Sequence, residues 1–165
     1  MQMALRPETY VALAASSGKV GLVCLEDTEL LDWEISIAAS KSVDGAFEQA
    51  TYWLRYYRPE VVITEEIPLH SRKGDNTRAV VEAIRAAADD LEIPWSEVVP
   101  VKRFDNKFKA AAQIATEYPQ LAPWLPEPRR PWEAEDRRII LFEAMTLWLE
   151  YAKVRFNEGA DTEPA

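Results

Sequence analysis

Residues 9–38, TYVALAASSGKVGLVCLEDTELLDWEISIA, hold three short apolar runs separated by two polar turns. Residues 9–14 and 19–25 are rich in β-branched and other apolar side chains, and the Ser-Ser-Gly step at 16–18 is a turn signal between two strands. Residues 30–38 alternate apolar and polar side chains, which is typical of a strand with one face in water. The apolar positions of this alternation are Leu31, Trp33, Ile35 and Ile37. The stretch therefore predicts an antiparallel meander of three strands.

The rest of the chain alternates between helical and strand patterns. Strands are predicted at residues 60–66 and 95–101, and a proline-rich extended connector at 119–131, which contains five prolines. Helices are predicted from residue 42 or 44 to 57, from 75 or 76 through 88, over 106–117, and from 132 or 133 to about 153. The order β-β-β-α-β-α-β-α-α predicts an α/β fold in which a five-stranded mixed sheet carries helices on both faces.

Length and composition indicate one ordinary globular domain. The 165 residues are 48% apolar and 28% charged, and we expect a single domain over residues 1–156 followed by a flexible acidic tail over 157–165. No apolar run approaches the roughly 20 residues of a membrane span, and the N-terminus lacks the features of a signal peptide. Cys24 has no second cysteine to pair with, which excludes an internal disulfide. We therefore expect a cytoplasmic protein with no membrane partner.

Charge is distributed unevenly along the chain. The net charge of −9 opposes nonspecific binding to nucleic acid, because the phosphates repel an acidic protein. The acidity lies in residues 1–71 and 139–165, whereas residues 72–138 carry 12 basic and 12 acidic side chains. Basic groups in this neutral middle either form a rim that contacts phosphates or are a solvated surface neutralised by neighbouring acids. Composition alone leaves both interpretations open.

Four segments place chemically active side chains in a fixed order. They are residues 10–20 (YVALAASSGKV), 59–66 (PEVVITEE), 99–119 (VPVKRFDNKFKAAAQIATEYP) and 133–136 (EAED). The first is an apolar strand that runs into a small-residue turn, the second is a strand that ends in two glutamates, and the third leads into a lysine-bearing loop and helix. Together they resemble the RuvC-type Holliday-junction resolvases, over residues 9–152. The resemblance implies the ribonuclease-H-like fold.

The resemblance also implies a metal-dependent nuclease site. In such a site two Mg²⁺ ions roughly 4 Å apart, held by carboxylates, stabilise the attacking water and the leaving oxygen of a phosphodiester. The resemblance assigns Glu65 (or its neighbour Glu66), Glu133 and Asp136 as catalytic residues and as ligands of Mg²⁺ or Mn²⁺. Each acid has a structural alternative, because acids are common at strand ends and are favoured by the dipole in the first turn of a helix.

The chain departs from the family at the end of the first strand, where Ala14 stands in place of the family's first aspartate. In the family that aspartate bridges both metal ions, so its absence implies reduced or lost catalysis. The small residues beside Ala14 supply no carboxylate either. Because a strand end next to a turn is expected to be partly solvated, Ala14→Asp is predicted to restore the carboxylate at modest structural cost.

Nucleic-acid contacts are predicted on basic side chains that follow strand ends. The residues assigned to this role are Arg72, Lys73, Lys102, Lys107 and Lys109. Trp124 and Trp132, in the proline-rich connector, either stack on bases or pin the connector to the domain. The resemblance implies branched or structured DNA as the partner and a homodimer as the assembly.

Three functions follow from these observations. The leading hypothesis is a nuclease-fold protein related to structure-specific DNA endonucleases, with reduced or lost activity and retained nucleic-acid binding. The first alternative is an active, divergent Mg²⁺-dependent endonuclease of the junction-resolvase type, and the second is a non-enzymatic protein-interaction module on the same fold. Actin-type ATPases share the strand order, but the five scattered glycines form no phosphate-binding loop, so we discount that class.

Overall fold

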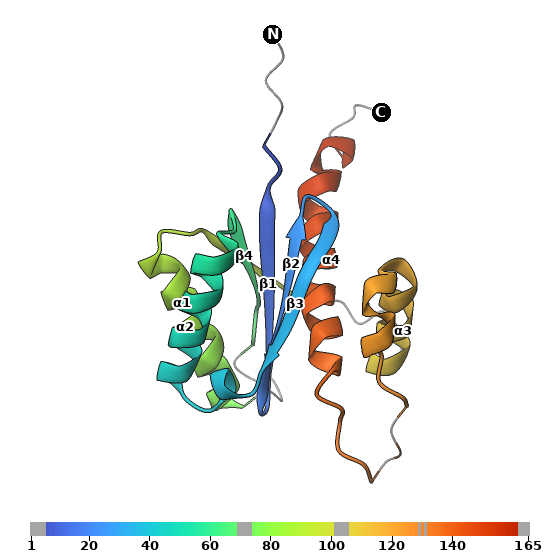
Figure 1. Ribbon diagram of the computed structural model, residues 1–165. Coiled ribbons are helices and arrows are strands. Elements are labelled where there is room, and N and C mark those ends of the chain that lie inside the picture. Colours follow the sequence, from blue (N-terminus) through green and yellow to red (C-terminus); the bar gives the residue numbers. More distant parts are fainter. Residues whose placement is uncertain (1–5, 69–73, 101–105, 129, 131, 162–165) are drawn as a thin grey trace.

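The computed structural model describes residues 6–68, 74–100, 106–128, 130 and 132–161, with side chains to residue 156. Its centre is a five-stranded mixed sheet with the strand order β3-β2-β1-β4-β5 (Figure 1). The strands are β1 Thr9–Ser16, β2 Lys19–Glu26, β3 Glu29–Ser36, β4 Val61–Glu65 and β5 Trp95–Val98. β1 pairs antiparallel with β2, and β2 with β3, which confirms the predicted meander.

The carboxyl ends of β1 and β4 lie side by side. The two strands are parallel, and residues 10–13 of β1 pair in register with residues 61–64 of β4. The next residues along the two strands are Ala14 and Glu65, which therefore lie side by side at the carboxyl ends of these two central strands. The position at which the resemblance places the family's first aspartate therefore lies beside the strand end that carries Glu65.

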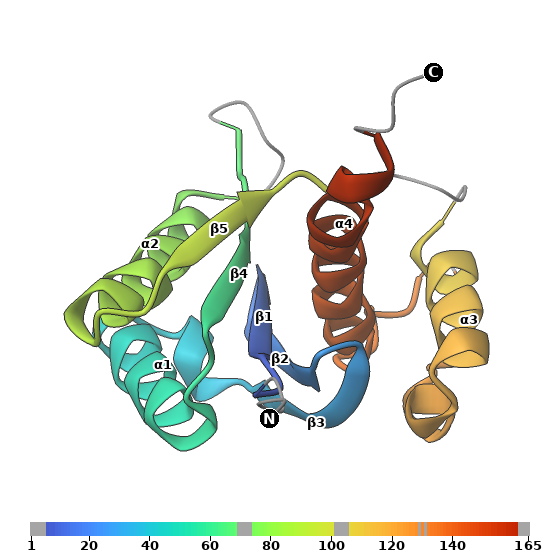
Figure 2. The same ribbon diagram turned by 90° about the horizontal axis from the view of Figure 1, so that it is seen from above.

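Helices cover both faces of the sheet, as predicted (Figure 2). The helices are α1 Val43–Tyr57, α2 Asp75–Asp90, α3 Lys107–Glu117 and α4 Ile139–Asp161. α1 and α2 pack on one face, and α4 packs on the other with α3 outside it (Figure 2). Side chains of β1 alternate between the two cores, because Leu13 packs toward α1 and α2, while Ala12 and Ala14 pack toward α4. The Ala14 side chain therefore lies on the face of the sheet that α4 covers.

One residue of β3 departs from the predicted alternation. The pairing of β2 with β3 shifts after Cys24, which makes Leu31 the extra residue of a β-bulge. Leu30 is buried as a result, and Leu31 is 48% exposed, contrary to the expectation that Leu31 belongs to the buried set. Trp33 and Ile35 keep their predicted side and pack against the core under α4.

The last helix begins later than its sequence pattern suggests. α4 starts at Ile139 rather than at Trp132 or Glu133, so Glu133 and Asp136 precede the helix instead of forming its first turn. The physical reason is the Asp136 side chain, whose Oδ1 accepts the backbone N–H of Arg138 at 2.9 Å. An aspartate that satisfies a backbone donor two residues ahead favours a turn or a helix start over a helix interior.

Most other element boundaries lie close to the predicted ones, but α4 continues to Asp161, past its predicted end near residue 153 and into the stretch expected to be a flexible tail. α3 begins after Asn106, whose Oδ1 caps the helix by accepting the Lys109 N–H at 2.9 Å. β5 ends at Val98, earlier than expected, and the connector holds a 3-10 helix, η2 Pro119–Trp124, where an extended segment was expected. Within the described residues, no helix is long and apolar enough to cross a bilayer.

Candidate functional site

Ala14 lies in the core beneath α4. It is 1% exposed and belongs to the apolar cluster between the sheet and this helix. Its partner across the β1–β2 pair is Gly21, and α4 approaches so closely there that a Cβ on Gly21 would lie 2.8 Å from Ile140 Cγ2. The expectation that position 14 is partly solvated is therefore wrong, because α4 covers the strand end and excludes water from it.

Glu65 sits at a strand end that is held by Arg85 of α2. The Arg85 guanidinium donates from Nε to Thr64 Oγ1 at 3.0 Å and from Nη2 to the backbone carbonyl of Glu65 at 2.9 Å. It also pairs with Glu97 of β5 at 3.1 Å. Ile63 packs on the side of α4, so strand alternation places Glu65 on that side too. Arg85 thus fixes this end of β4 from the opposite face of the sheet.

Two lysines and two glutamates form an ion-pair cluster on the α4 side, which we call the lysine–glutamate cluster (Lys19, Lys107, Glu135 and Glu143). Lys19 Nζ lies 3.4 Å from Glu135 Oε1. Lys107 Nζ lies 3.6 Å from Glu135 Oε2 and 3.0 Å from Glu143 Oε1. The cluster therefore joins the start of β2, the start of α3, the segment before α4 and α4 itself.

The cluster neutralises its own carboxylates. Burial by itself disfavours the Lys107 ammonium, but the carboxylates of Glu143 and Glu135 outweigh it and raise the pKa of Lys107 above its ordinary value. The second oxygen of Glu143, Oε2, is buried and has no hydrogen-bond partner among the described residues. Lys107, which the sequence assigns to a phosphate-binding rim, thus has two partners within the protein. The only sequence signal for Glu143 is that it is the one acid in the apolar run IILFEAMTLWL, residues 139–149.

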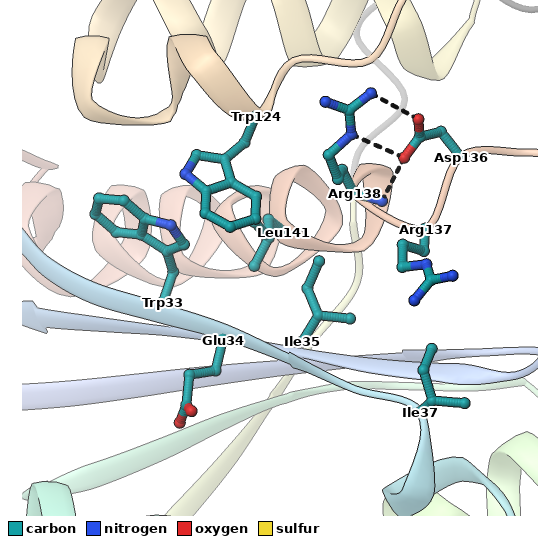
Figure 3. A pocket seen from close by; sticks show the side chains of 9 residues that line it. All are labelled: Trp33, Glu34, Ile35, Ile37, Trp124, Asp136, Arg137, Arg138 and Leu141. Atoms are coloured by element: carbon teal, nitrogen blue, oxygen red, sulfur yellow. Dashed lines mark hydrogen bonds and ion pairs between the residues drawn. The ribbon is translucent and has the colours of Figure 1, made fainter.

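Of the three acids directly before α4, Glu133 and Asp136 are paired with arginines. Arg138 donates from Nε to Asp136 Oδ1 at 3.0 Å and from Nη2 to Oδ2 at 2.8 Å (Figure 3). These side-chain hydrogen bonds lower the pKa of Asp136 from 3.8 to about 2, and the backbone N–H of Arg138 adds to the effect. Glu133 lies farther from its partner, with 3.8 Å between Oε1 and Arg130 Nε.

Arg138→Gln is expected to raise the pKa of Asp136 from about 2 toward its ordinary value of 3.8. Some lowering remains, because the backbone N–H of residue 138 still donates. A carboxyl group with a lowered pKa stabilises the fold above the unfolded-state value and loses that contribution as the pH falls through about 2. An NMR titration of the side-chain carboxyl carbon measures the pKa directly. Arg130→Gln is the matched control, and an equal shift in that variant would contradict the assignment to Arg138.

The described acids do not fit a two-metal nuclease site. Ala14 offers no side-chain oxygen between the strand ends, and the carboxylates of Asp136 and Glu135 are occupied by Arg138 and by lysines. In the described part of the chain, no group of three or more His, Cys, Asp or Glu side chains is placed to hold an ion. Glu65, Glu133 and Asp136 are therefore not gathered as three ligands of one metal.

Of the other residues predicted to contact nucleic acid, some lie outside the described residues and the rest are exposed. Arg72, Lys73 and Lys102 lie outside the described residues. Lys109 is exposed on the first turn of α3. Trp132 is 76% exposed, with the Arg130 guanidinium 5.6 Å from the centroid of its ring.

A cleft of about 690 Å³ opens between β3, η2 and the segment that leads into α4 (Figure 3). Trp33 of β3 and Trp124 of η2 form one wall and meet edge to face, with ring centroids 6.5 Å apart. This contact pins the connector to the sheet, which is one of the two roles the sequence predicts for Trp124. Trp124 nevertheless remains 38% exposed. Arg137 and Arg138 line the other end of the cleft (Figure 3).

Comparison with solved structures identifies similar folds. T. thermophilus RuvC in complex with its Holliday junction substrate matches with a TM-score of 0.62 at 19% identity, over 94% of this chain and 97% of that chain. RuvC of Thermus thermophilus alone gives 0.60 at 19% identity over 93% and 97%. The fowlpox virus Holliday junction resolvase gives 0.58 at 13% identity over 88% and 98%. No protein-family model and no curated protein matches the chain. The chain therefore has the ribonuclease-H-like fold of these resolvases.

Proposed function

We propose that this chain, which has the fold of the RuvC-type resolvases, binds branched DNA and hydrolyses it slowly or not at all. DNA binding is supported by the shared fold, because the matched RuvC structure contains a Holliday junction and the matched viral protein is a Holliday junction resolvase. The RuvC match covers 94% of this chain and 97% of that one, so the likeness extends to the whole fold rather than to a fragment.

The buried Ala14 is the observation that carries the proposed loss of hydrolysis. Two divalent cations roughly 4 Å apart repel each other strongly, and a carboxylate that touches both offsets this repulsion. Acids that bind one ion each do not. Ala14 stands beside Glu65 at the strand ends, has no side-chain oxygen, and is 1% exposed beneath α4. The described acids around it supply no bridging group.

The lysine–glutamate cluster supports the same conclusion. The Lys107 ammonium already compensates the carboxylates of Glu135 and Glu143 at 3.6 and 3.0 Å. A divalent cation can use these carboxylates only if it displaces a lysine that they hold in its charged form. The positive charge that a nuclease of this fold takes from metal ions is therefore supplied here, in part, by the protein's own side chains.

DNA binding has to overcome a net charge of −9. Because all of the net negative charge lies in residues 1–71 and 139–165, the neutral middle of the chain is the part that can approach phosphates. Lys109 and Arg137 are exposed cations of this middle part. We expect few phosphate contacts, a moderate dependence on salt, and selectivity that comes from the shape of the junction.

The direct test compares a four-way junction with a linear duplex of equal length in mobility-shift assays. We expect the junction to bind about tenfold more tightly than the duplex, and its affinity to fall between about 50 and 200 mM salt. Incubation of the junction with this protein and Mg²⁺ or Mn²⁺ should give no metal-dependent cleavage. An active RuvC-type resolvase, which should cleave the same junction, is the positive control. Glu65→Gln should leave junction binding unchanged.

Two outcomes would overturn the proposal. Robust cleavage by the wild type that Glu65→Gln abolishes would establish an active metal-dependent endonuclease. Absence of junction binding at low salt would leave the protein-interaction module, which the acidic ends of the chain favour, as the function.

A further inference from the structure

The cleft in Figure 3 combines an aromatic wall with a cationic end. Trp33 and Trp124 form the wall, and Ile35 and Leu141 lie between them and the arginines. The edge-to-face contact between the two indoles fixes their positions, so Trp124 is held in place although it is 38% exposed. A rigid, partly exposed indole beside apolar side chains is the surface on which a planar aromatic ligand stacks with little loss of conformational freedom.

The charge at the other end of the cleft is positive. Arg138 is neutralised by its two contacts with Asp136, whereas the Arg137 guanidinium has no ion pair or hydrogen bond within the described part of the chain. Glu34 borders the cleft, but its carboxylate points to the opposite side of β3 (Figure 3), where Oε2 accepts the Trp53 indole N–H at 2.5 Å. The described side chains that face into the cleft therefore carry a net charge of +1, from Arg137 and Arg138 against Asp136.

We propose that this cleft binds an unstacked nucleotide, with its base against Trp124 and its phosphate at Arg137. An aromatic ring with an anionic substituent is the chemistry that an indole wall and a guanidinium select together. The volume of about 690 Å³ lies within the range of small-ligand sites. The proposal rests on the proposed function only for the source of the nucleotide, which is an unpaired position of branched DNA rather than free nucleoside monophosphate.

The test uses fluorescence anisotropy of a labelled ten-nucleotide oligothymidylate, competition by thymidine monophosphate, and mobility shifts with the four-way junction. Trp124→Ala should weaken oligothymidylate binding about tenfold, and Trp124→Phe should recover most of it, because stacking needs only an aromatic face. Arg137→Gln should weaken binding and reduce the slope of log affinity against log salt by roughly one. Thymidine monophosphate should compete only at much higher concentration, because it has a single nucleotide.

Matched controls come from α1, which packs on the opposite face of the sheet. Tyr52→Ala removes an aromatic side chain that is 63% exposed, and Arg55→Gln removes an exposed guanidinium. Both should bind the oligonucleotide as the wild type does. Circular dichroism and the thermal midpoint show whether each variant is folded, and the Trp124→Phe variant keeps the test valid if Trp124→Ala is unstable.

The outcomes separate the cleft from the proposed function. If Trp124→Ala and Arg137→Gln bind the junction and the oligonucleotide as the wild type does, the proposal that the cleft binds a nucleotide is overturned. The proposed function is then unaffected. Oligonucleotide binding that depends on Trp124, without any junction binding, would support the cleft and overturn the proposed function. Free nucleotide that competes as well as the oligonucleotide would overturn DNA as the source, and binding of neither DNA would overturn both proposals.

Discussion

Ala14→Asp is expected to lower the free energy of unfolding by about 3–5 kcal/mol at pH 8. Position 14 is 1% exposed beneath α4, so a carboxylate there would lose its hydration. Lys19 on the neighbouring strand is already paired with Glu135, so its charge would compensate the new carboxylate only in part. Urea unfolding of the variant and the wild type at 25 °C measures the difference.

Ala14→Asn is the matched control because an amide has the same shape and no charge. We expect it to cost about 1–3 kcal/mol as a buried polar group, with the rest of the Ala14→Asp effect due to charge. Burial raises the pKa of the introduced carboxyl above its ordinary value of about 3.9. The folded state then keeps the proton to higher pH than the unfolded state, so the deficit grows as the pH rises above about 4. Equal stability of the two variants at pH 8 would contradict the charge argument.

The Ala14→Asp variant also tests whether adding the missing carboxylate is enough to form a two-metal nuclease site. We expect that millimolar Mg²⁺ neither restores the stability of Ala14→Asp nor produces junction cleavage. The reason is that Glu135 and Asp136 are already compensated by lysines and by Arg138. Stabilisation by Mg²⁺ in Ala14→Asp, but not in Ala14→Asn, would show that a metal site forms and would contradict this expectation.

The elements that depend on local patterns are those that sequence reasoning predicts well. The alternation of apolar and polar residues through Trp33 and Ile35 reports a half-buried strand directly, and the structure has that strand. The alanine-rich run over residues 106–117 predicts a helix, and the structure has α3 there, capped by the Asn106 side chain. Such patterns depend only on residues that are close in the sequence, so they predict a strand or a helix without knowledge of the tertiary structure.

The features that sequence reasoning misses depend on what another element covers. Ala14 is dry because α4 lies over it, a fact that residues near position 14 do not encode. The lysine–glutamate cluster joins residues more than 100 positions apart, such as Lys19 and Glu135, and charge patterning along the chain does not reveal such pairs. The late start of α4 follows from one hydrogen bond of Asp136, a residue that suits a helix start or a first turn equally well. Side-chain roles at this site therefore required the tertiary structure.

Gly21→Ala is expected to destabilise the protein by about 3 kcal/mol, because it overfills the contact between β2 and α4. A Cβ at this position would lie 2.8 Å from Ile140 Cγ2 and 2.9 Å from the Ile140 carbonyl oxygen. A side-chain atom can rotate away, but a helix carbonyl moves only if α4 moves. Alanine restricts the unfolded chain and would by itself stabilise the fold by about 0.5–1 kcal/mol. The overlap is therefore expected to outweigh this gain.

Gly74→Ala is the control, because a Cβ there meets nothing within 4 Å and should change stability by less than about 1 kcal/mol. The Gly21 variant also tests the burial of position 14. If α4 is displaced from β2, water reaches the neighbouring Ala14, and Ala14→Asp should then cost less in the Gly21→Ala background than in the wild type. A double-mutant cycle measured by urea unfolding gives this coupling, expected at about 1–2 kcal/mol. A coupling of zero would mean that the packing of α4 over Gly21 is not what keeps position 14 dry.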